Sequence, residues 1–200
     1  VEQGFVCFPE GNVALSALSK VKEDSCYQVI SGGLQKVALY SDESRFYYKL
    51  LPTSDWPTFT LSSTPMHRHT KLSPREDTLT KISAIAPISG NVLDTCCGLG
   101  YTAVVALQNG ASAVYTFERD PYVVALQKMN PYSQDLFTSS SIHLVEDTVV
   151  DHLSEFNDQF FTCILHDPPT FAYAPELYAV EFYMRLFRLL KHQGKLYHYC

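Results

Sequence analysis

Up to about residue 72, the chain shows short runs in which apolar and polar residues tend to alternate. Four such runs lie at residues 26–30, 36–40, 46–51 and 59–61. Alternation with a period of two is typical of strands that bury one face. Turn-forming segments such as Ser31-Gly32-Gly33 separate several of the runs. We therefore predict a β-rich module with a small antiparallel sheet over residues 1–72.

From residue 73 onward the pattern predicts helices that alternate with strands. Ser73, Pro74 and Glu76 have the spacing of a helix N-cap, a first helical residue and the return partner of a capping box. Further strands are predicted at 92–95, 113–118, 142–145, 160–165 and 195–199, with helices at 101–109, 121–129, 149–156 and 175–190. This alternation predicts a doubly wound, mostly parallel α/β sheet over residues 73–200.

The composition is that of a well-packed intracellular protein. Apolar residues make up 46% of the chain and aromatic residues 13%, which argues against disorder. No run approaches the roughly 18 apolar residues of a membrane span, and the first residues do not resemble a signal peptide. The six cysteines form no C-x-x-C pair, so we expect neither a metal site nor a disulfide framework. These features predict a cytoplasmic protein with reduced cysteines.

Charge is distributed unevenly along the chain. Residues 1–81 contain nine basic and nine acidic residues, whereas residues 82–200 contain six basic and twelve acidic residues and account for the net charge of −6. Proteins that bind long nucleic acids usually carry a basic surface. The acidic C-terminal part therefore favours a cationic or neutral substrate.

A glycine loop follows the first predicted strand of the C-terminal part. Asp94 lies in that strand, and Gly98 and Gly100 precede a helix whose free N–H groups can face a ligand. A dinucleotide fingerprint stays formally open, because Ala103 occupies its third glycine position. Asp94 would repel a pyrophosphate, but it suits the cationic methionine end of S-adenosylmethionine. We therefore predict a methyl-donor site in this loop, comprising Asp94, Cys96, Gly98 and Gly100.

Three further residues are candidates for binding the same donor. Glu118 ends the second strand, where a carboxylate can accept hydrogen bonds from both ribose hydroxyls. Asp147 follows the third strand and either accepts from the adenine amino group or caps the next helix. Arg68 lies in the loop before the first long helix and is a candidate for binding the donor's carboxylate.

A rigid acidic turn follows the fourth strand, at His166-Asp167-Pro168-Pro169, with Phe171 two residues further on. Two consecutive prolines cannot continue a strand ladder, so the chain must leave the sheet at its carboxyl edge, where such sheets bind ligands. Asp167 is then placed to orient an acceptor N–H, and Phe171 to stack against the acceptor. His166 or a carboxylate is a candidate general base for an acceptor that arrives protonated. The candidate catalytic residues are His166, Asp167, Pro168, Pro169 and Phe171.

These motifs resemble motifs I, II and IV of class I methyltransferases. The last, Asp167-Pro168-Pro169-x-Phe171, is similar to the Asp/Asn-Pro-Pro-aromatic signature of enzymes that methylate nitrogen on bases or glutamine, and to the Asp-Pro-Pro-x-Phe motif of ribosomal RNA methyltransferases. A more specific similarity, over about residues 45–200, is to a family of predicted, chiefly archaeal methyltransferases, some labelled spermidine-synthase-like. The shared segments are Met66-His67-Arg68, Pro74-x-Glu76-Asp77-Thr78, Leu93-Asp94-Thr95-Cys96, Gly98-Leu99-Gly100-Tyr101-Thr102-Ala103, Asn130-Pro131-Tyr132-Ser133, His166-Asp167-Pro168-Pro169, Glu176-Leu177-Tyr178, Glu181-Phe182-Tyr183 and Leu196-Tyr197-His198-Tyr199. The resemblance implies a Rossmann-like methyltransferase fold with S-adenosyl-L-methionine as cofactor. It leaves the acceptor open among a small amine, a protein and RNA.

Two features depart from the family pattern. Cys97 stands where the loop more often has threonine or glycine. The chain also stops at Cys200, after the fifth predicted strand, where class I methyltransferases add a helix and a β-hairpin. That strand would be an open sheet edge. We therefore expect a truncated chain, or an edge that is covered by another copy or by residues 1–72.

Three functions are consistent with these motifs. The first is methyl transfer to nitrogen on a base, a protein side chain or a small amine. The second is aminopropyl transfer from decarboxylated S-adenosylmethionine, as in polyamine synthases. The third is a non-catalytic subunit that binds the adenosine cofactor.

Other polar residues bear on the acceptor side. Glu176, Tyr178 and Glu181 follow the Asp-Pro-Pro turn and are candidates for an acidic acceptor pocket. Asp77 and Lys81 are four residues apart on a predicted helix, which is the usual spacing of a surface ion pair. A nucleophilic role for the cysteine pair at 96–97 is disfavoured, because the pair lies in the donor loop.

Overall fold

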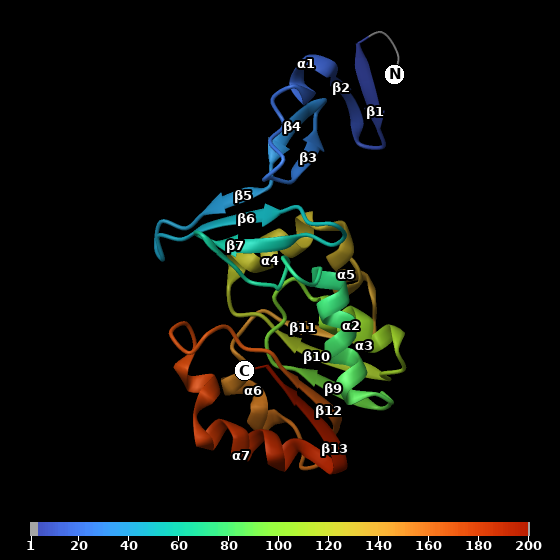
Figure 1. Cartoon of the computed structure of the whole chain (residues 1–200). Coiled ribbons are helices and arrows are strands. Elements are labelled where there is room, and N and C mark those ends of the chain that lie inside the picture. The colour runs from blue at the N-terminus through green and yellow to red at the C-terminus, as the bar shows by residue number, and fades with distance from the viewer. Residues whose placement is uncertain (1–3, 200) are drawn as a thin grey trace. The chain divides into compact units, whose positions relative to one another are not determined.

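The computed structural model describes residues 4–199 (Figure 1). The chain divides into two compact units, Val1–Pro74 and Arg75–Cys200. Antiparallel strands build the first unit, and a parallel sheet with helices builds the second. None of the helices within the described residues is both long enough and apolar enough to cross a membrane.

The N-terminal unit consists of antiparallel strands and one short helix, α1 (Leu15–Leu18). Two hairpins come first, formed by β1 (Phe5–Phe8) with β2 (Gly11–Ala14) and by β3 (Tyr27–Ile30) with β4 (Gly33–Lys36). A four-stranded sheet follows in the order β5 (Ala38–Tyr40), β6 (Tyr47–Leu51), β7 (Thr58–Leu61) and β8 (Thr64–Pro65).

Alternation along β6 explains why this sheet has a buried face. Tyr48 and Leu50, two residues apart, are both buried, and Leu50 lies opposite buried Phe59 of β7. The strands expected at residues 26–30, 46–51 and 59–61 are present, whereas the run expected at 36–40 is divided between β4 and β5, which lie in different sheets. The hairpin of β1 and β2 was not predicted from the sequence pattern.

The C-terminal unit contains a five-stranded sheet in the order β11-β10-β9-β12-β13, in which all neighbouring strands are parallel. Its strands are β9 (Asn91–Asp94), β10 (Ala113–Phe117), β11 (Ile142–Val145), β12 (Phe161–His166) and β13 (Leu190–His198). The chain runs from β9 to one side as far as β11 and then crosses back to β12. The strand order therefore reverses between β9 and β12, which is where open α/β sheets bind ligands. This architecture confirms the predicted Rossmann-like fold.

Helices connect the strands of this sheet. The α-helices are α2 (Pro74–Ile85), α3 (Tyr101–Gln108), α4 (Pro121–Met129), α5 (Asp135–Thr138), α6 (Val149–His152) and α7 (Val180–Leu189). Short 3-10 helices lie at η1 (Pro131–Ser133), η2 (Leu153–Glu155) and η3 (Pro175–Tyr178). Asp120 caps α4 by accepting from the N–H of Tyr122, with Pro121 as the first helical residue.

The helix predicted over residues 175–190 is interrupted. Residues Pro175–Tyr178 form a 3-10 turn, and Ala179 is extended with a ψ of 144° before α7 begins. Side-chain bonds draw the turn to the end of β12, because the carbonyl of Leu177 accepts from His166 and the hydroxyl of Tyr178 donates to the carbonyl of Pro169. These tertiary contacts override the continuous helical pattern.

Buried apolar residues of the central strands and of α7 form the core. Leu93 of β9, Ile164 of β12 and Leu186 of α7 have no solvent exposure. Each such side chain contributes about 1.5–3 kcal/mol through burial. The core thereby fixes the carboxyl ends of β9 and β12 against each other.

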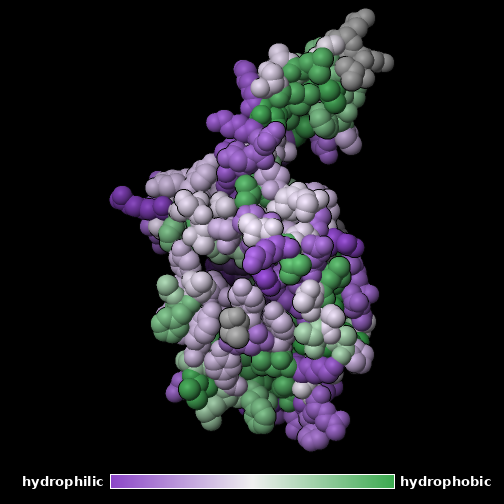
Figure 2. All heavy atoms as spheres, in the orientation of Figure 1, coloured by the Kyte–Doolittle hydropathy of each residue, from purple (hydrophilic) through white to green (hydrophobic). Residues whose placement is uncertain are grey.

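The sheet ends at β13, which pairs with β12 alone among the described strands. Leu196 of β13 and the following Tyr199 are 38% and 40% exposed. On the neighbouring helix α7, Val180, Met184 and Phe187 are also exposed, and Figure 2 shows apolar side chains gathered over this end of the C-terminal unit. That another copy or residues 1–72 cover the β13 edge stays a prediction.

Candidate functional site

Asp94 is a fully buried carboxylate at the carboxyl end of β9, the central strand of the parallel sheet. Its Oδ2 atom accepts hydrogen bonds from the hydroxyls of Thr102 at 3.0 Å and Thr116 at 2.9 Å. No described residue forms a hydrogen bond with its other oxygen, Oδ1. Burial raises the pKa of Asp94 to about 7, and the carboxylate of Asp167 adds to the rise. Because an unpartnered buried oxygen is costly, a cationic group would be stabilised here.

The loop after Asp94 takes a shape that favours glycine. Gly98 and Gly100 have φ angles of 54° and 79°, in the left-handed region. A Cβ atom on Gly100 would lie 2.3 Å from Cδ1 of Leu136. The helix α3 begins directly after this loop, at Tyr101. The arrangement has the features of a ligand cradle at a helix N-terminus.

Buried polar side chains at the end of α4 and in η1 hold this loop. Gln127 donates to the carbonyl of Gly98 at 2.6 Å, and Ser133 donates to the carbonyl of Leu99 at 2.7 Å. The amide of Asn130 donates in turn to the hydroxyl of Ser133 at 2.8 Å. None of these three side chains is exposed to solvent. Buried networks of this kind rigidify the main chain that they contact, so the segment after α4 fixes the geometry of the loop.

Ser133→Ala is expected to weaken donor binding roughly tenfold while the protein stays folded, because the loss of the Ser133 hydroxyl removes a buried partner from the Leu99 carbonyl and from one N–H of the Asn130 amide, whose nitrogen still donates to Tyr101. Titration calorimetry with S-adenosylmethionine measures the effect. Ser83→Ala, at an exposed position of α2, is the matched control. Wild-type donor affinity in Ser133→Ala would contradict the assigned role of this network.

Glu118 follows β10 and is tied to the same loop. Its Oε2 atom accepts from the main-chain N–H of Gly98 at 3.0 Å, and its Oε1 atom accepts from that of Asp120 at 3.0 Å. Burial raises the pKa of Glu118 to about 7. The residue nevertheless remains partly exposed, which the predicted role toward a ribose requires. The structure thus brings Asp94, Gly98 and Glu118 together at the ends of two adjacent strands.

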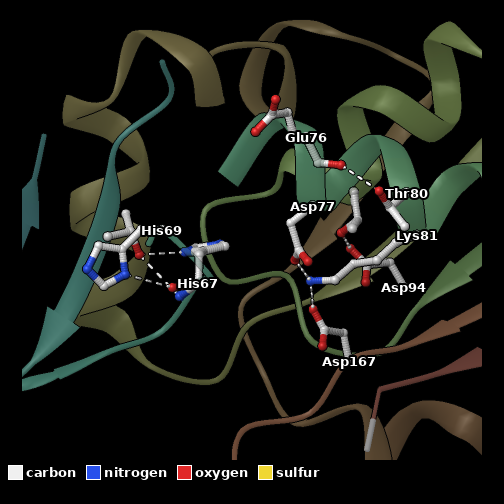
Figure 3. Close-up of polar contacts among 10 residues, drawn as sticks. His67, His69, Glu76, Asp77, Thr80, Lys81, Asp94 and Asp167 are labelled. Carbon is white, nitrogen blue, oxygen red and sulfur yellow. Dashed lines mark hydrogen bonds and ion pairs between the residues drawn. The ribbon is translucent and has the colours of Figure 1, made fainter. Parts of the chain in front are cut away.

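Asp167 forms an ion pair with a lysine of α2. The Nζ atom of Lys81 lies 2.6 Å from Oδ2 of Asp167 and 2.7 Å from Oδ2 of Asp77 (Figure 3). The side chains of Lys81 and Asp77 are only 7% and 5% exposed, and that of Asp167 is 25% exposed. The expectation of a surface pair between Asp77 and Lys81 is therefore wrong, since the pair is buried and reaches the Asp-Pro-Pro turn. Asp94 lies beside this cluster (Figure 3).

His166 points into the protein interior and is fully buried. Its Nε2–H donates to the carbonyl of Leu177 at 3.0 Å, which leaves Nδ1 to accept from the hydroxyl of Thr95 at 2.8 Å. Burial lowers the pKa of His166 to about 4, so the ring is neutral. This geometry argues against the general-base role predicted for His166. The residue instead connects β9, β12 and η3.

The two prolines and Phe171 follow Asp167 at the end of β12. Pro168 is buried and Pro169 is partly buried, with the carbonyl of Pro169 accepting from the hydroxyl of Tyr178 at 2.8 Å. Phe171 is 64% exposed, and its ring packs edge-on against Tyr178 with centroids 5.7 Å apart. The turn is therefore held by side-chain bonds, whereas the ring of Phe171 is accessible to solvent.

The acidic acceptor pocket predicted around Glu176 takes a different form. Arg119, directly after Glu118, donates to Oε1 of Glu176 at 2.6 Å and to the carbonyl of Tyr173 at 2.7 Å. This bridge joins the end of β10 to the segment after the Asp-Pro-Pro turn. Glu176 therefore forms an ion pair with Arg119, and the hydroxyl of Tyr178 donates to the carbonyl of Pro169 in the turn itself.

The remaining predicted donor residues have distinct environments. Thr148 is the N-cap of α6, so the cap role proposed for Asp147 is wrong; Asp147 pairs with Nε2 of His152 at 3.2 Å. Burial raises the pKa of the Cys96 thiol well above its usual range, which keeps the thiol protonated and unsuited to nucleophilic attack. Arg68 belongs to the N-terminal unit. The roles of Asp147 toward adenine and of Arg68 toward the donor's carboxylate stay predictions.

Comparison with curated proteins finds a relative of similar sequence. No protein-family model matches it. The uncharacterized protein MJ1233 from Methanocaldococcus jannaschii is 41% identical over 201 residues, which cover 99% of this chain and 68% of that protein.

Solved structures with little sequence identity share the fold. The spermidine synthase from Thermotoga maritima is 18% identical, with a TM-score of 0.57 over 77% of this chain and 53% of that chain. The TYW2 protein from P. horikoshii, solved in complex with MeSAdo, is 12% identical, with a TM-score of 0.50 over 88% of this chain and 58% of that chain. The chain thus spans little more than half the length of these solved chains.

Proposed function

The chain belongs to the family of the M. jannaschii protein MJ1233, and we propose that it is an S-adenosylmethionine-dependent methyltransferase that acts on nitrogen. The observation that carries this proposal is Asp94, a buried carboxylate with one unpartnered oxygen at the point where the strand order reverses. That position is the ligand site of open α/β sheets.

The chemistry of the donor side fits a cationic adenosine cofactor. A sulfonium or ammonium group would compensate the charge of Asp94, whereas a pyrophosphate would be repelled by it. The partly exposed carboxylate of Glu118 is suited to ribose hydroxyls, and the loop of Gly98 and Gly100 permits a close approach of the main chain. When bound, S-adenosylmethionine supplies an already activated methyl group, so the protein has to orient the acceptor and exclude water.

The acceptor side is built around Asp167. Its Oδ2 atom is held by Lys81, while Oδ1 forms no hydrogen bond with any described residue. A carboxylate with one free oxygen can accept one N–H of the acceptor and thereby direct the nitrogen lone pair. The exposed ring of Phe171 can stack against a planar group or pack against an alkyl chain. These features support a base, a protein side chain or a small amine as the acceptor.

Aminopropyl transfer from decarboxylated S-adenosylmethionine is the second candidate. The observation in its favour is that Lys81, the cation beside Asp167, is already shared by two carboxylates. A donor that lacks a carboxylate would need no further cation, and its primary amine would suit the acidic surroundings. The similarity in fold to a spermidine synthase is compatible with this alternative.

Donor-binding calorimetry followed by a labelling screen tests the proposal. S-adenosylmethionine should bind more tightly than its decarboxylated form, and NAD should not bind. Donor labelled in the methyl group should then transfer its label to one of three fractions: RNA, protein or polyamines. Preference for the decarboxylated donor would support aminopropyl transfer instead. Binding without any labelled product would indicate a cofactor-binding subunit.

A further inference from the structure

Lys81 connects the helix α2 to the Asp-Pro-Pro turn, although the two segments are far apart in the sequence. Its ammonium group lies between the carboxylates of Asp77, on the same helix, and Asp167, at the end of β12. Figure 3 shows the lysine side chain reaching across from α2 so that its nitrogen meets both oxygens. The nitrogen also lies 5.7 Å from the centroid of the Tyr199 ring, beyond β13.

The surroundings keep Lys81 charged in spite of its burial. Burial alone would lower its pKa, but the attraction of Asp167 and Asp77 outweighs this effect and raises the pKa of Lys81. Two carboxylates and one ammonium leave the cluster with a net charge of about −1. A buried cluster of this kind is stabilising only while every charge keeps its partner, so its geometry is restricted to a narrow range.

We propose that Lys81 is a positioning residue of the acceptor site, with Asp77 holding Lys81 in turn. The contact to Oδ2 sets the rotation of the Asp167 carboxylate and leaves Oδ1 for the acceptor N–H. The same contact anchors the Asp-Pro-Pro turn to α2. The effect on transfer rests on the function proposed above, in which Asp167 faces the acceptor.

The first readout needs neither donor nor acceptor. In Lys81→Met, hydrogen–deuterium exchange of the amides between residues 167 and 173 should become at least tenfold faster, while exchange in β11 stays at the wild-type rate. Asp167→Asn should accelerate the same amides by a similar factor. The variant that combines Lys81→Met with Asp167→Asn should then exchange at less than twice the rate of Asp167→Asn alone, because both substitutions break the same contact between Lys81 and Asp167. Lys128→Met, on an exposed lysine of α4, is the matched control.

Removing one partner of a buried pair is strongly destabilising, so Lys81→Met is accompanied by Lys81→Met/Asp77→Asn, which removes one charge of each sign. Lys81→Arg keeps the charge and should restore slow exchange at the turn. The proposal would be overturned if folded Lys81→Met/Asp77→Asn showed wild-type exchange at residues 167–173, or if exchange became equally faster in all segments.

The second readout separates orientation from binding. With labelled donor and the acceptor fraction that wild type modifies, Lys81→Met/Asp77→Asn should have a kcat at least tenfold below that of wild type. Its donor affinity should change less than twofold. Lys81→Arg should recover most of kcat. An unaltered kcat would show that the contact does not set the orientation of Asp167. If wild type binds no donor, the proposed function fails, whereas the exchange experiment still decides whether Lys81 holds the turn.

Discussion

Asp167→Asn is expected to slow methyl transfer at least about 100-fold, while the dissociation constant for the donor changes by no more than about twofold. Asparagine keeps the size of the side chain but loses the negative charge of the ion pair. Its oxygen would accept from Lys81, so its NH2 group, a donor, would stand where the acceptor N–H needs an oxygen. The donor contacts are assigned to Asp94, Gly98 and Glu118, and Asp167 influences Asp94 only through a contribution to its pKa that ranks behind burial, so donor affinity should change little. Rates are measured with labelled S-adenosylmethionine and the acceptor fraction that wild type modifies, and donor affinity by calorimetry.

Asp135→Asn is the matched control for this experiment. Asp135 is an exposed carboxylate in the first turn of α5, so its substitution should leave both rate and affinity at wild-type values. If Asp167→Asn turns over at the wild-type rate, the Asp-Pro-Pro segment is only a structural turn. If donor affinity falls as much as the rate, Asp167 belongs to the donor side.

The architecture of the C-terminal unit could be predicted because its signals are local. Each strand of the sheet is a short apolar run, and each connection carries its own start or stop residue, such as Asp120 and Pro121 before α4. Carboxylates at strand ends then meet at one edge, because parallel strands share their direction. This is why Asp94, Glu118 and Asp167 could be assigned to one edge of the sheet from sequence.

The opposite orientations of His166 and Asp167 were harder to foresee. Adjacent residues of a strand point to opposite sides, but the sequence does not state which of two polar neighbours faces inward. The structure buries His166 and leaves Asp167 partly exposed. A general base at His166 was therefore a wrong prediction, although its position beside the turn was right.

Lys81 was misassigned because i,i+4 spacing describes only the helix itself. Its partner Asp167 is distant in the sequence, and spacing holds no information about it. The hydrophobic periodicity of α2 is weak, so the sequence pattern does not show that Lys81 shares a buried face with Thr78, Ile82 and Ile85. Only the fold shows that this lysine is buried and that another element must supply its counter-charge.

The network of Gln127, Asn130 and Ser133 illustrates a different limit. The segment around Asn130 resembles a family motif, but its residue types do not indicate any particular chemistry. Its bonds go to main-chain carbonyls of the glycine loop, and a carbonyl leaves no trace in the sequence. Contacts of this kind become visible only when the fold has brought the two segments together.

Raising the pH from about 5 to 8 is expected to lower the stability of the folded protein and to strengthen donor binding. Burial raises the pKa of Asp94 from its ordinary 3.8 to about 7. Since the folded state binds the proton more tightly than the unfolded state, the stabilisation from protonated Asp94 is complete below about pH 4. It is lost as the pH rises through about 7, and the integrated loss is on the order of 4 kcal/mol. Glu118 changes in the same direction.

Donor binding should strengthen over the same pH range, because a cation binds the ionised form of Asp94. Ionisation rises from about one tenth at pH 6 to about nine tenths at pH 8, so affinity for S-adenosylmethionine should increase roughly tenfold. Calorimetry of the donor at several pH values and urea unfolding without donor measure the two effects on the same protein.

Asp94→Asn separates the contribution of Asp94 from that of other titrating groups. Asparagine resembles the protonated carboxyl group, so the variant should lose less stability than wild type between pH 5 and 8, and its unfolding curves should converge with those of wild type at the acidic end. At pH 8 its donor affinity should be close to the low value that wild type has at pH 6. Any remaining dependence of donor affinity on pH should come from Glu118. Asp151→Asn, on an exposed carboxylate of α6, should follow wild type in both measurements. Equal pH slopes in wild type and Asp94→Asn would mean that Asp94 does not titrate in this range, and equal donor affinities at pH 8 would mean that its unpartnered oxygen does not bind the donor's charge.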